Sequence, residues 1–469
     1  MSHAADDVTS ETTTDEVGDT ATGRRRTPRR TLVAIAAGVA VVAAASVAAG
    51  VAVRADREPE AAPVPASVPV ALTASGLPDD TRLGVVLTLG QGEGSEWNGA
   101  AQGARVAERR FELGGTDVSL VTVDDGGTVD GARAAVESLV DQGVAGIVVA
   151  SAGPHVSGAL DAASDAGVPV VLPYGASDEA DGVSGAWSTS PSQATTGAAL
   201  AAALGDARST LVVDLGGGSP VGVEVARVLT ASTIGDDNAV ADEVARLTGS
   251  AAPLDDPDAT TEAPEPVTDP SDAVVLSGSA ARQAGLVSAL QATDLRVPVL
   301  LTPDATSPAF STALSAGGGS LSSGFVTVGV DSDDAVALRS DAAGRSMSAY
   351  LGAVRVLASD DAATNLTDDQ PFSAVAAQAD SRSHDAVVAL VRAVATADSV
   401  DPAEVSSALS SLSLGAADGV AGPALDFTAG TAAGGGELEV LHASSQPLGL
   451  RPTADGESRI VWFADPATN

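Results

Sequence analysis

The side chains that could do chemistry in this chain are carboxylates, hydroxyls and arginines, because the usual nucleophiles and bases are scarce. The sequence has no cysteine and no lysine, which excludes a thiol nucleophile, a disulfide, a thiolate metal site and an amine for Schiff-base or P-loop chemistry. A thin supply of four histidines remains for acid–base work: His3, His155, His384 and His442. These absences argue against an enzyme, and we expect neither a cofactor nor a metal.

Two glycine-rich loops lack residues that enzymes place in such loops. The loop 90–95 has no glycine at the third position of a dinucleotide fingerprint, and its Glu93 would repel a pyrophosphate. The cluster before Ser219 has Val221 where the nucleophile elbow of a hydrolase needs its second glycine. The acidic run at 255–258 lacks the spacing of an EF-hand. The sequence therefore favours binding over catalysis.

The overall charge limits the kinds of partner that the chain can bind. With 62 acidic residues against 24 basic ones, the net charge is −38 at pH 7. Such a surface repels nucleic acid and anionic lipid head groups, so we expect no nucleic-acid partner. At 469 residues, the chain is long enough for two lobes of ordinary size.

The N-terminal residues have the features of a targeting segment rather than of the folded domain. Residues 1–30 are polar and end in an arginine cluster, which predicts a disordered cytoplasmic tail. The uncharged run Thr31–Val53 is 23 residues long, and at ~1.5 Å per residue a helix of this length crosses a ~30 Å hydrocarbon core. Arginines on its N-terminal side predict that the rest of the chain is exported.

Two fates of this run stay open. A retained signal anchor is the reading we favour, because the run is longer than most apolar regions of signal peptides. The alternative is a cleaved signal, since Arg29-Arg30-Thr31 resembles a twin-arginine motif and small residues surround Ala45 and Ala48. Residues 54–80 are then a linker rich in proline and alanine.

From Arg82 onward, apolar runs alternate with helical patterns. Short apolar strands separated by amphipathic helices predict a doubly wound parallel sheet. The first series predicts strands at 82–89, 118–123, 145–150 and 168–172, with helices at 97–113, 129–140 and 155–166.

A second series begins at Pro191, which we place in the first turn of a helix. It predicts a further helix from Val221, strands at 211–215, 273–276, 297–301 and 325–330, late helices at 345–358, 384–397 and 402–412, and β structure at 425–427, 437–442 and 459–463. The stretch 249–270 is rich in Pro, Asp and Thr and predicts a flexible insertion. This many strands favours two lobes over one sheet.

The order of the motifs resembles the type I periplasmic-binding family, in particular the leucine/isoleucine/valine-binding proteins of branched-chain amino-acid ABC transporters. The resemblance covers roughly residues 82–465 and rests on Glu96-Trp-Asn-Gly-Ala100, Val121-Thr-Val-Asp-Asp125, Asp165-Ala-Gly-Val-Pro-Val-Val-Leu-Pro173, Ser190-Pro-Ser192, His384-Asp-Ala-Val-Val-Ala-Leu390 and Gly422-Pro-Ala-Leu-Asp-Phe427. It implies two α/β lobes, joined by three crossings, that close on a small ligand. Loops at the carboxyl ends of the strands would meet helix N-termini, which favour carboxylates.

The resemblance also implies candidate ligand-binding residues in the first lobe. The serine-rich carboxylate grip of the family falls at Ser151–Ser157, with His155 where the family has serine, so His155 either donates to an anion or caps a turn. The fourth strand ends in Tyr174-Gly-Ala-Ser177, where the family usually offers a serine or threonine hydroxyl to the ligand. Trp97 lies where related proteins carry an aromatic near the ligand, although a place in the core is the alternative.

In the second lobe, Asp304 aligns with the acidic partner of the ligand's ammonium group, the alternative being an exposed turn. Ser279 lies where the family often has an aromatic residue, and Ser219 replaces the usual Tyr-Gly. The full candidate set is Trp97, Ser151, His155, Ser157, Tyr174, Ser177, Ser219, Ser279 and Asp304.

These expectations combine into an α/β chain with two doubly wound parallel-sheet lobes after an N-terminal transmembrane helix. Lobe one is expected at 81–190 plus about 331–420, and lobe two at 191–330 plus about 421–469. The function implied is extracytoplasmic capture of a small ligand, an amino acid or related carboxylate, for an ABC importer with permease subunits as partners. The alternative is a membrane-tethered sensor or scaffold ectodomain.

Overall fold

A computed structural model describes residues 69–464 apart from 93, 176, 251–266, 323, 430, 433–437 and 453–458. These residues belong to one compact unit, Ala66–Asn469, and the other unit, Met1–Pro65, lies outside them. The expected cytoplasmic tail, transmembrane run and most of the linker therefore also lie outside. No helix in the described ranges combines the length and apolar character needed to cross a membrane.

The first sheet has five strands, all parallel, in the order β2-β1-β3-β4-β5. Its strands are β1 (Arg82–Leu87), β2 (Ser119–Asp124), β3 (Ile147–Val149), β4 (Val170–Leu172) and β5 (Ala186–Ser188). The connecting helices are η1 (Ser95–Trp97), α2 (Asn98–Ala101), α3 (Gly103–Leu113), α4 (Val129–Asp141), α5 (Val156–Ala166) and α6 (Ser177–Ala180). The predicted alternation of strand and helix is confirmed for this series.

Both faces of the first sheet are covered, which explains why its strands are apolar throughout. Successive residues of β1 enter different cores: Leu83 and Val85 pack on the side of α3 and of the late helix α12 (Ser381–Ala397), whereas Val86 packs on the side of α4 and α5. Gly84 points toward α4, where an added Cβ would lie 2.7 Å from Leu139 Cδ1. Glycine there lets the helix approach the sheet closely.

The second sheet has seven strands in the order β14-β13-β10-β9-β8-β6-β7, with β13 and β14 antiparallel to their neighbours. Its strands are β6 (Thr210–Asp214), β7 (Arg227–Thr230), β8 (Ala273–Ser277), β9 (Val299–Leu301), β10 (Val326–Gly329), β13 (Glu439–Ser444) and β14 (Val461–Ala464). Its helices are α7 (Gln193–Ala203), η2 (Ala231–Thr233), α8 (Asp237–Leu247), α9 (Ala280–Leu290), η3 (Pro303–Thr306) and α10 (Pro308–Ala316). Two separate apolar clusters cover its two faces.

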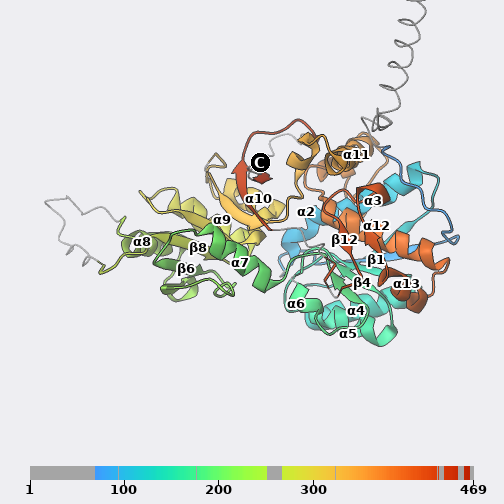
Figure 1. The fold of residues 1–469 in the computed structure, drawn as a ribbon, viewed down its shortest axis with the longest axis horizontal. Coiled ribbons are helices and arrows are strands. Elements are labelled where there is room, and N and C mark those ends of the chain that lie inside the picture. The colour runs from blue at the N-terminus through green and yellow to red at the C-terminus, as the bar shows by residue number, and fades with distance from the viewer. Residues whose placement is uncertain are drawn as a thin grey trace, which may run out of the picture. The chain divides into compact units, whose positions relative to one another are not determined.

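After β10 the chain returns to the first sheet. The returning elements are η4 (Asp334–Leu338), α11 (Ala342–Ala358), η5 (Phe372–Ala374), α12 (Ser381–Ala397), α13 (Pro402–Leu409), β11 (Ser413–Leu414), η6 (Ala416–Asp418) and β12 (Leu425–Asp426). In Figure 1 the orange α12 lies beside the blue α3, so segments far apart in sequence share one core. Leu425 and Phe427, in the range expected for the second lobe, also pack in this core.

Two expected helix positions are wrong. Helix α7 is capped by Ser192, whose hydroxyl accepts a hydrogen bond from Thr195 N at 3.0 Å, so Pro191 lies before the helix and not in its first turn. No helix begins at Val221, which is half exposed. Turns occupy this stretch, with Gly222 at a φ of +82°, and the chain then enters β7. The β-branched residues of β7 pair with β6 in parallel.

Candidate functional site

A cavity of about 1220 Å³ lies at the carboxyl ends of strands from both sheets. Loops that follow β3, β4, β6, β8 and β9 contribute to its lining, together with the start of α12. Carboxyl ends of parallel strands are where α/β sheets bind ligands, because helix N-termini and short loops meet there. The chain thus assembles one lined space from segments that lie far apart in sequence, from Gly90 to Trp462.

A stacked aromatic pair forms part of the lining on the side of the first sheet. The rings of Trp97 and Tyr174 lie 4.5 Å apart at their centroids and only 7° from parallel, and both residues are buried. The guanidinium carbon of Arg382 lies 4.7 Å from the Trp97 centroid and 4.8 Å from that of Tyr174. The arginine therefore lies beside the stack, at nearly the same distance from both rings, and aromatic rings attract a cation at this range.

Asp380 holds this cluster in place. It is the N-cap of α12, and its carboxylate accepts hydrogen bonds from the Tyr174 hydroxyl at 2.9 Å and from Arg382 Nε at 2.8 Å. Burial, followed by the neighbouring Asp380 charge, raises the pKa of Tyr174 well above its ordinary value. The phenol consequently stays a hydrogen-bond donor at neutral pH.

Asp304 lies on the side of the second sheet, in η3. Its carboxylate accepts a hydrogen bond from Thr302 Oγ1 at 3.3 Å, and no salt bridge to it is found within the described ranges. Burial raises the pKa of Asp304, and the positive charge of Arg382 partly opposes that rise. Asp304 and Arg382 both line the cavity and are here called the charged pair.

The cavity also contains two arginines that are already neutralised. Arg451 Nη2 lies 2.7 Å from Asp334, and Arg459 bridges Asp334 at 2.9 Å and Asp333 at 2.8 Å. Burial favours neutral Asp334, but the two arginines outweigh it and hold the pKa of this carboxyl below its ordinary range. This cluster ties the segment after β10 to the C-terminal strands.

The hydroxyl and imidazole side chains of the predicted carboxylate grip do not line the cavity, although Ala152 and Gly153 of the same stretch do. Ser151 Oγ lies 2.7 Å from Thr88 Oγ1 and 2.9 Å from His155 Nε2, and Asp125 Oδ2 lies 3.3 Å from the same nitrogen. All four side chains, here called the internal network, are at most 2% exposed, and none lines the cavity. Because one nitrogen, Nε2, faces both the serine and the aspartate, the group also lacks the relay geometry of a hydrolase triad.

A glycine explains why the internal network is closed. Gly94, at a φ of +93°, carries the loop after β1 directly over Ser151, and an added Cβ would lie 2.0 Å from Ser151 Oγ. The hydroxyl is sealed beneath this backbone. The family resemblance predicted Ser151 and His155 as ligand-binding residues. Ser151 follows β3 and His155 is the N-cap of α5, but both side chains are buried in the protein.

The remaining candidates divide in the same way. Five of the nine line the cavity: Trp97, Tyr174, Ser219, Ser279 and Asp304. Ser279 is the N-cap of α9, but its hydroxyl makes no capping hydrogen bond. Ser157 is exposed and donates to Pro154 O at 2.7 Å, outside the cavity. Ser177 begins α6, and only its backbone is described.

Sequence reasoning missed Asp380 and Arg382. The helix was expected to begin at His384, whereas it begins at Ser381 with Asp380 as its cap. The signal was present, because an aspartate directly before a helical pattern is a favoured N-cap residue. Because α12 begins about one turn earlier than expected, Arg382 belongs to its first turn and lines the cavity.

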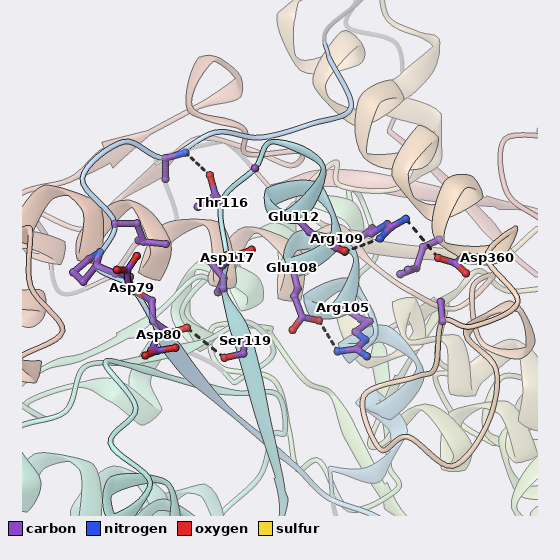
Figure 2. Close-up of a pocket in the computed structure, with 18 of the residues that line it drawn as sticks. Asp79, Asp80, Arg105, Glu108, Arg109, Glu112, Thr116, Asp117, Ser119 and Asp360 are labelled. Atoms are coloured by element: carbon purple, nitrogen blue, oxygen red, sulfur yellow. Dashed lines mark hydrogen bonds and ion pairs between the residues drawn. The ribbon is translucent and has the colours of Figure 1, made fainter.

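A second cavity, of about 750 Å³, lies at the opposite, amino-terminal edge of β1 and β2. Figure 2 shows two arginines of this cavity turned toward acidic side chains. Arg105 pairs with Glu108 at 2.6 Å, and Arg109 pairs with Glu112 at 2.6 Å and Asp360 at 3.5 Å. The larger cavity lies at the carboxyl ends of the strands, where α/β sheets bind ligands, and is therefore the better candidate site.

Comparison with known proteins agrees with this geometry. The model of a family described as periplasmic binding protein matches residues 80–436. No curated protein matches the sequence of this chain.

Solved structures share the fold at low sequence identity. A leucine-binding protein from Thermotoga maritima is 16% identical, over 82% of this chain and 98% of its own, with a TM-score of 0.53. A substrate-binding protein from Desulfitobacterium hafniense in complex with leucine is 15% identical, over 82% and 100%, with a TM-score of 0.54. A solute-binding protein from R. palustris in complex with 4-hydroxybenzoate is 16% identical, over 82% and 96%, with a TM-score of 0.52. On the strength of the family match over residues 80–436, and with a fold shared with these structures, this chain belongs to the periplasmic binding proteins, which bind substrates and are not enzymes.

Proposed function

We propose that this chain captures a small amino acid or related carboxylate between two lobes and delivers it to an ABC importer. The observation that carries the proposal is Asp304, a carboxylate in the cavity lining whose pKa is raised by burial. Its hydrogen-bond donor is the hydroxyl of Thr302, and no cation is paired with it in the described part of the chain. An ammonium group would supply the missing counter-charge.

The similar structures support a ligand of this class. Those from Desulfitobacterium hafniense and Streptococcus pneumoniae hold leucine and isoleucine, and that from R. palustris holds 4-hydroxybenzoate. All three ligands are small carboxylates, and the first two also carry an ammonium group. The cavity of about 1220 Å³ is roomy for such a ligand, which suits lobes that approach each other on binding. The proposed lobes are 81–190 with about 331–420, and 191–330 with about 421–469.

We propose further that Thr31–Val53 anchors the chain in the membrane with the lobes outside. The run is uncharged over 23 residues, and five arginines precede it on the side that would stay in the cytoplasm. The expected partners are then permease subunits of the importer in the same membrane. Protease treatment of intact cells should digest the lobes, and lobes that survive this treatment while lysed cells lose them would refute the topology.

Titration calorimetry of the full chain against the twenty standard amino acids tests the capture function. At least one should bind, and Asp304→Asn should weaken its binding roughly 30-fold, since removing one partner of a desolvated charge pair costs about 2 kcal/mol or more. Asp294→Asn is the matched control, because Asp294 is 80% exposed and pairs only with Arg296. If none of the amino acids binds the unaltered chain, the proposal for amino acids is wrong.

A further inference from the structure

We propose that Arg382 binds the carboxylate of the ligand and that the ligand is an α-amino acid rather than a plain carboxylic acid. This inference rests on the proposed capture function. Arg382 lies in the first turn of α12, lines the cavity and has a side chain that is 26% exposed. Its Nε donates to Asp380, and neither Nη atom has a hydrogen-bond partner among the residues that the structure describes.

The other arginines of the lining are less suited to this role. Arg451 is only 8% exposed and is committed to Asp334, while Arg459 is shared between two aspartates. Arg282 is half exposed on α9, where it lies 3.9 Å from Asp237. Arg382 is thus the arginine that combines a position in the lining with two unsatisfied donors.

The surroundings of Arg382 orient these donors before a ligand arrives. The Trp97–Tyr174 stack lies against the guanidinium at 4.7 and 4.8 Å, and the Tyr174 hydroxyl fixes Asp380, which in turn fixes Nε. A guanidinium held in this way presents a planar fork that matches the two oxygens of a carboxylate. Little side-chain entropy remains to be lost on binding.

The charged residues of the cavity lining favour a zwitterion as the ligand. Asp304 and Asp380 both line the cavity together with Arg382, and Asp380 pairs with Arg382 Nε at 2.8 Å. A plain carboxylate would satisfy Arg382 but leave Asp304 without a counter-charge. An α-amino acid can place its carboxylate on Arg382 and its ammonium on Asp304 within the same cavity.

This assignment also replaces the carboxylate grip that family alignment had placed at Ser151–Ser157. Those hydroxyls are bonded within the internal network or exposed away from the cavity. They would have to break several buried hydrogen bonds to reach a ligand, whereas the Nη atoms of Arg382 break none.

The test compares an amino acid with its own carboxamide, which keeps the ammonium and loses the negative charge. The tightest-binding of the twenty standard amino acids and its primary amide are titrated into the full chain by calorimetry. The unaltered chain should prefer the acid at least 30-fold, and it should bind 4-hydroxybenzoate more weakly than the amino acid. In Arg382→Gln the affinity for the acid should fall at least 30-fold and the preference should shrink to below threefold. Arg382→Lys should recover part of the preference, because it restores the charge without the planar fork.

Arg133→Gln is the matched control, because Arg133 is 36% exposed, pairs with Asp161 at 3.0 Å and lies outside the cavity lining. It should behave like the unaltered chain. A preference for the acid that survives in a folded Arg382→Gln variant overturns the role of Arg382 and leaves the capture function intact. A chain that binds 4-hydroxybenzoate more tightly than every amino acid overturns the zwitterion. If no ligand of the set binds the unaltered chain, the capture function and this inference fail together.

Discussion

The internal network and the charged pair are built from similar side chains at the carboxyl ends of strands, but their polar atoms find partners in different ways. In the internal network, Asp125 Oδ1 accepts hydrogen bonds from Thr88 Oγ1 at 2.7 Å and from Gly127 N at 2.8 Å. In the charged pair, Asp304 accepts one side-chain hydrogen bond, at 3.3 Å. Asp125 Oδ1 is thus satisfied by the protein, whereas Asp125 Oδ2 and His155 Nδ1 have no hydrogen-bond partner among the described residues. The carboxylate of Asp304 lines the cavity and is left for a ligand to complete.

The two aspartates differ in pKa for the same reason. Burial favours the neutral form of Asp125, yet polar interactions with His155, Gly127 and Thr88 outweigh it and hold the pKa of this carboxyl below its ordinary value. Burial raises the pKa of Asp304, and fewer donors oppose it. A polar residue at a strand end is therefore assigned to structure or to binding by its number of donors and not by its position.

The largest expected effect comes from removing the acceptor at the centre of the internal network. Asp125→Ala removes the buried acceptor of Thr88 Oγ1 and Gly127 N and the carboxylate that faces His155, which should lower the free energy of unfolding by about 3 kcal/mol. Urea unfolding measures this loss. Affinity for an amino acid should change less than threefold, in contrast to Asp304→Asn.

Asp161→Ala serves as the control for this prediction, because Asp161 is 66% exposed in its pair with Arg133. An exposed pair of this kind contributes less than about 0.5 kcal/mol to stability. If Asp125→Ala weakened ligand binding as strongly as Asp304→Asn, the distinction between the two groups would be wrong.

A smaller effect tests whether the loop over Ser151 keeps the internal network closed. Gly94→Ala combines a positive φ with a clash at 2.0 Å, whereas Gly90→Ala has a positive φ of +79° and no atom within 4 Å of the added Cβ. Urea unfolding should show a loss of about 2 kcal/mol for Gly94→Ala and about 1 kcal/mol for Gly90→Ala. Equal losses would mean that the loop does not press on Ser151.

Much of the fold could be predicted from the sequence, because buried parallel strands and their helices leave strong local patterns. The apolar run at 82–89 predicts β1 (Arg82–Leu87), and the pattern at 129–140 predicts α4 (Val129–Asp141). The errors arose where short-range signals compete. Pro191 precedes Ser192, which is a better N-cap residue for α7 than proline. The stretch after Val221 contains a turn glycine and β-branched residues, and the latter pair as strand β7.

The candidate site could be predicted only in part. Trp97, Tyr174 and Asp304 were expected from family alignment and line the cavity. Alignment places a residue at a strand end but does not say which way its side chain points, and so it could not show that the loop at Gly94 seals Ser151. Arg382 was missed because its position depends on where α12 begins, which a single capping residue decides.

The smallest expected effect is a difference in sign between the two aspartates as pH changes. The folded-state pKa of Asp125 is lowered, so its stabilising contribution is present above the ordinary value of about 3.9 and is lost as pH falls through the folded pKa. The folded-state pKa of Asp304 is raised, so the folded state holds its proton more tightly. Stability from Asp304 is therefore lost as pH rises from about 3.9 through the folded pKa.

Urea unfolding of the unaltered chain, Asp125→Ala and Asp304→Asn between pH 3 and 7 measures both contributions. The difference in unfolding free energy between the unaltered chain and Asp125→Ala should widen as pH rises. Over the same range Asp304→Asn should gain on the unaltered chain. Two differences that change in the same direction with pH would contradict the opposite environments that separate the internal network from the charged pair.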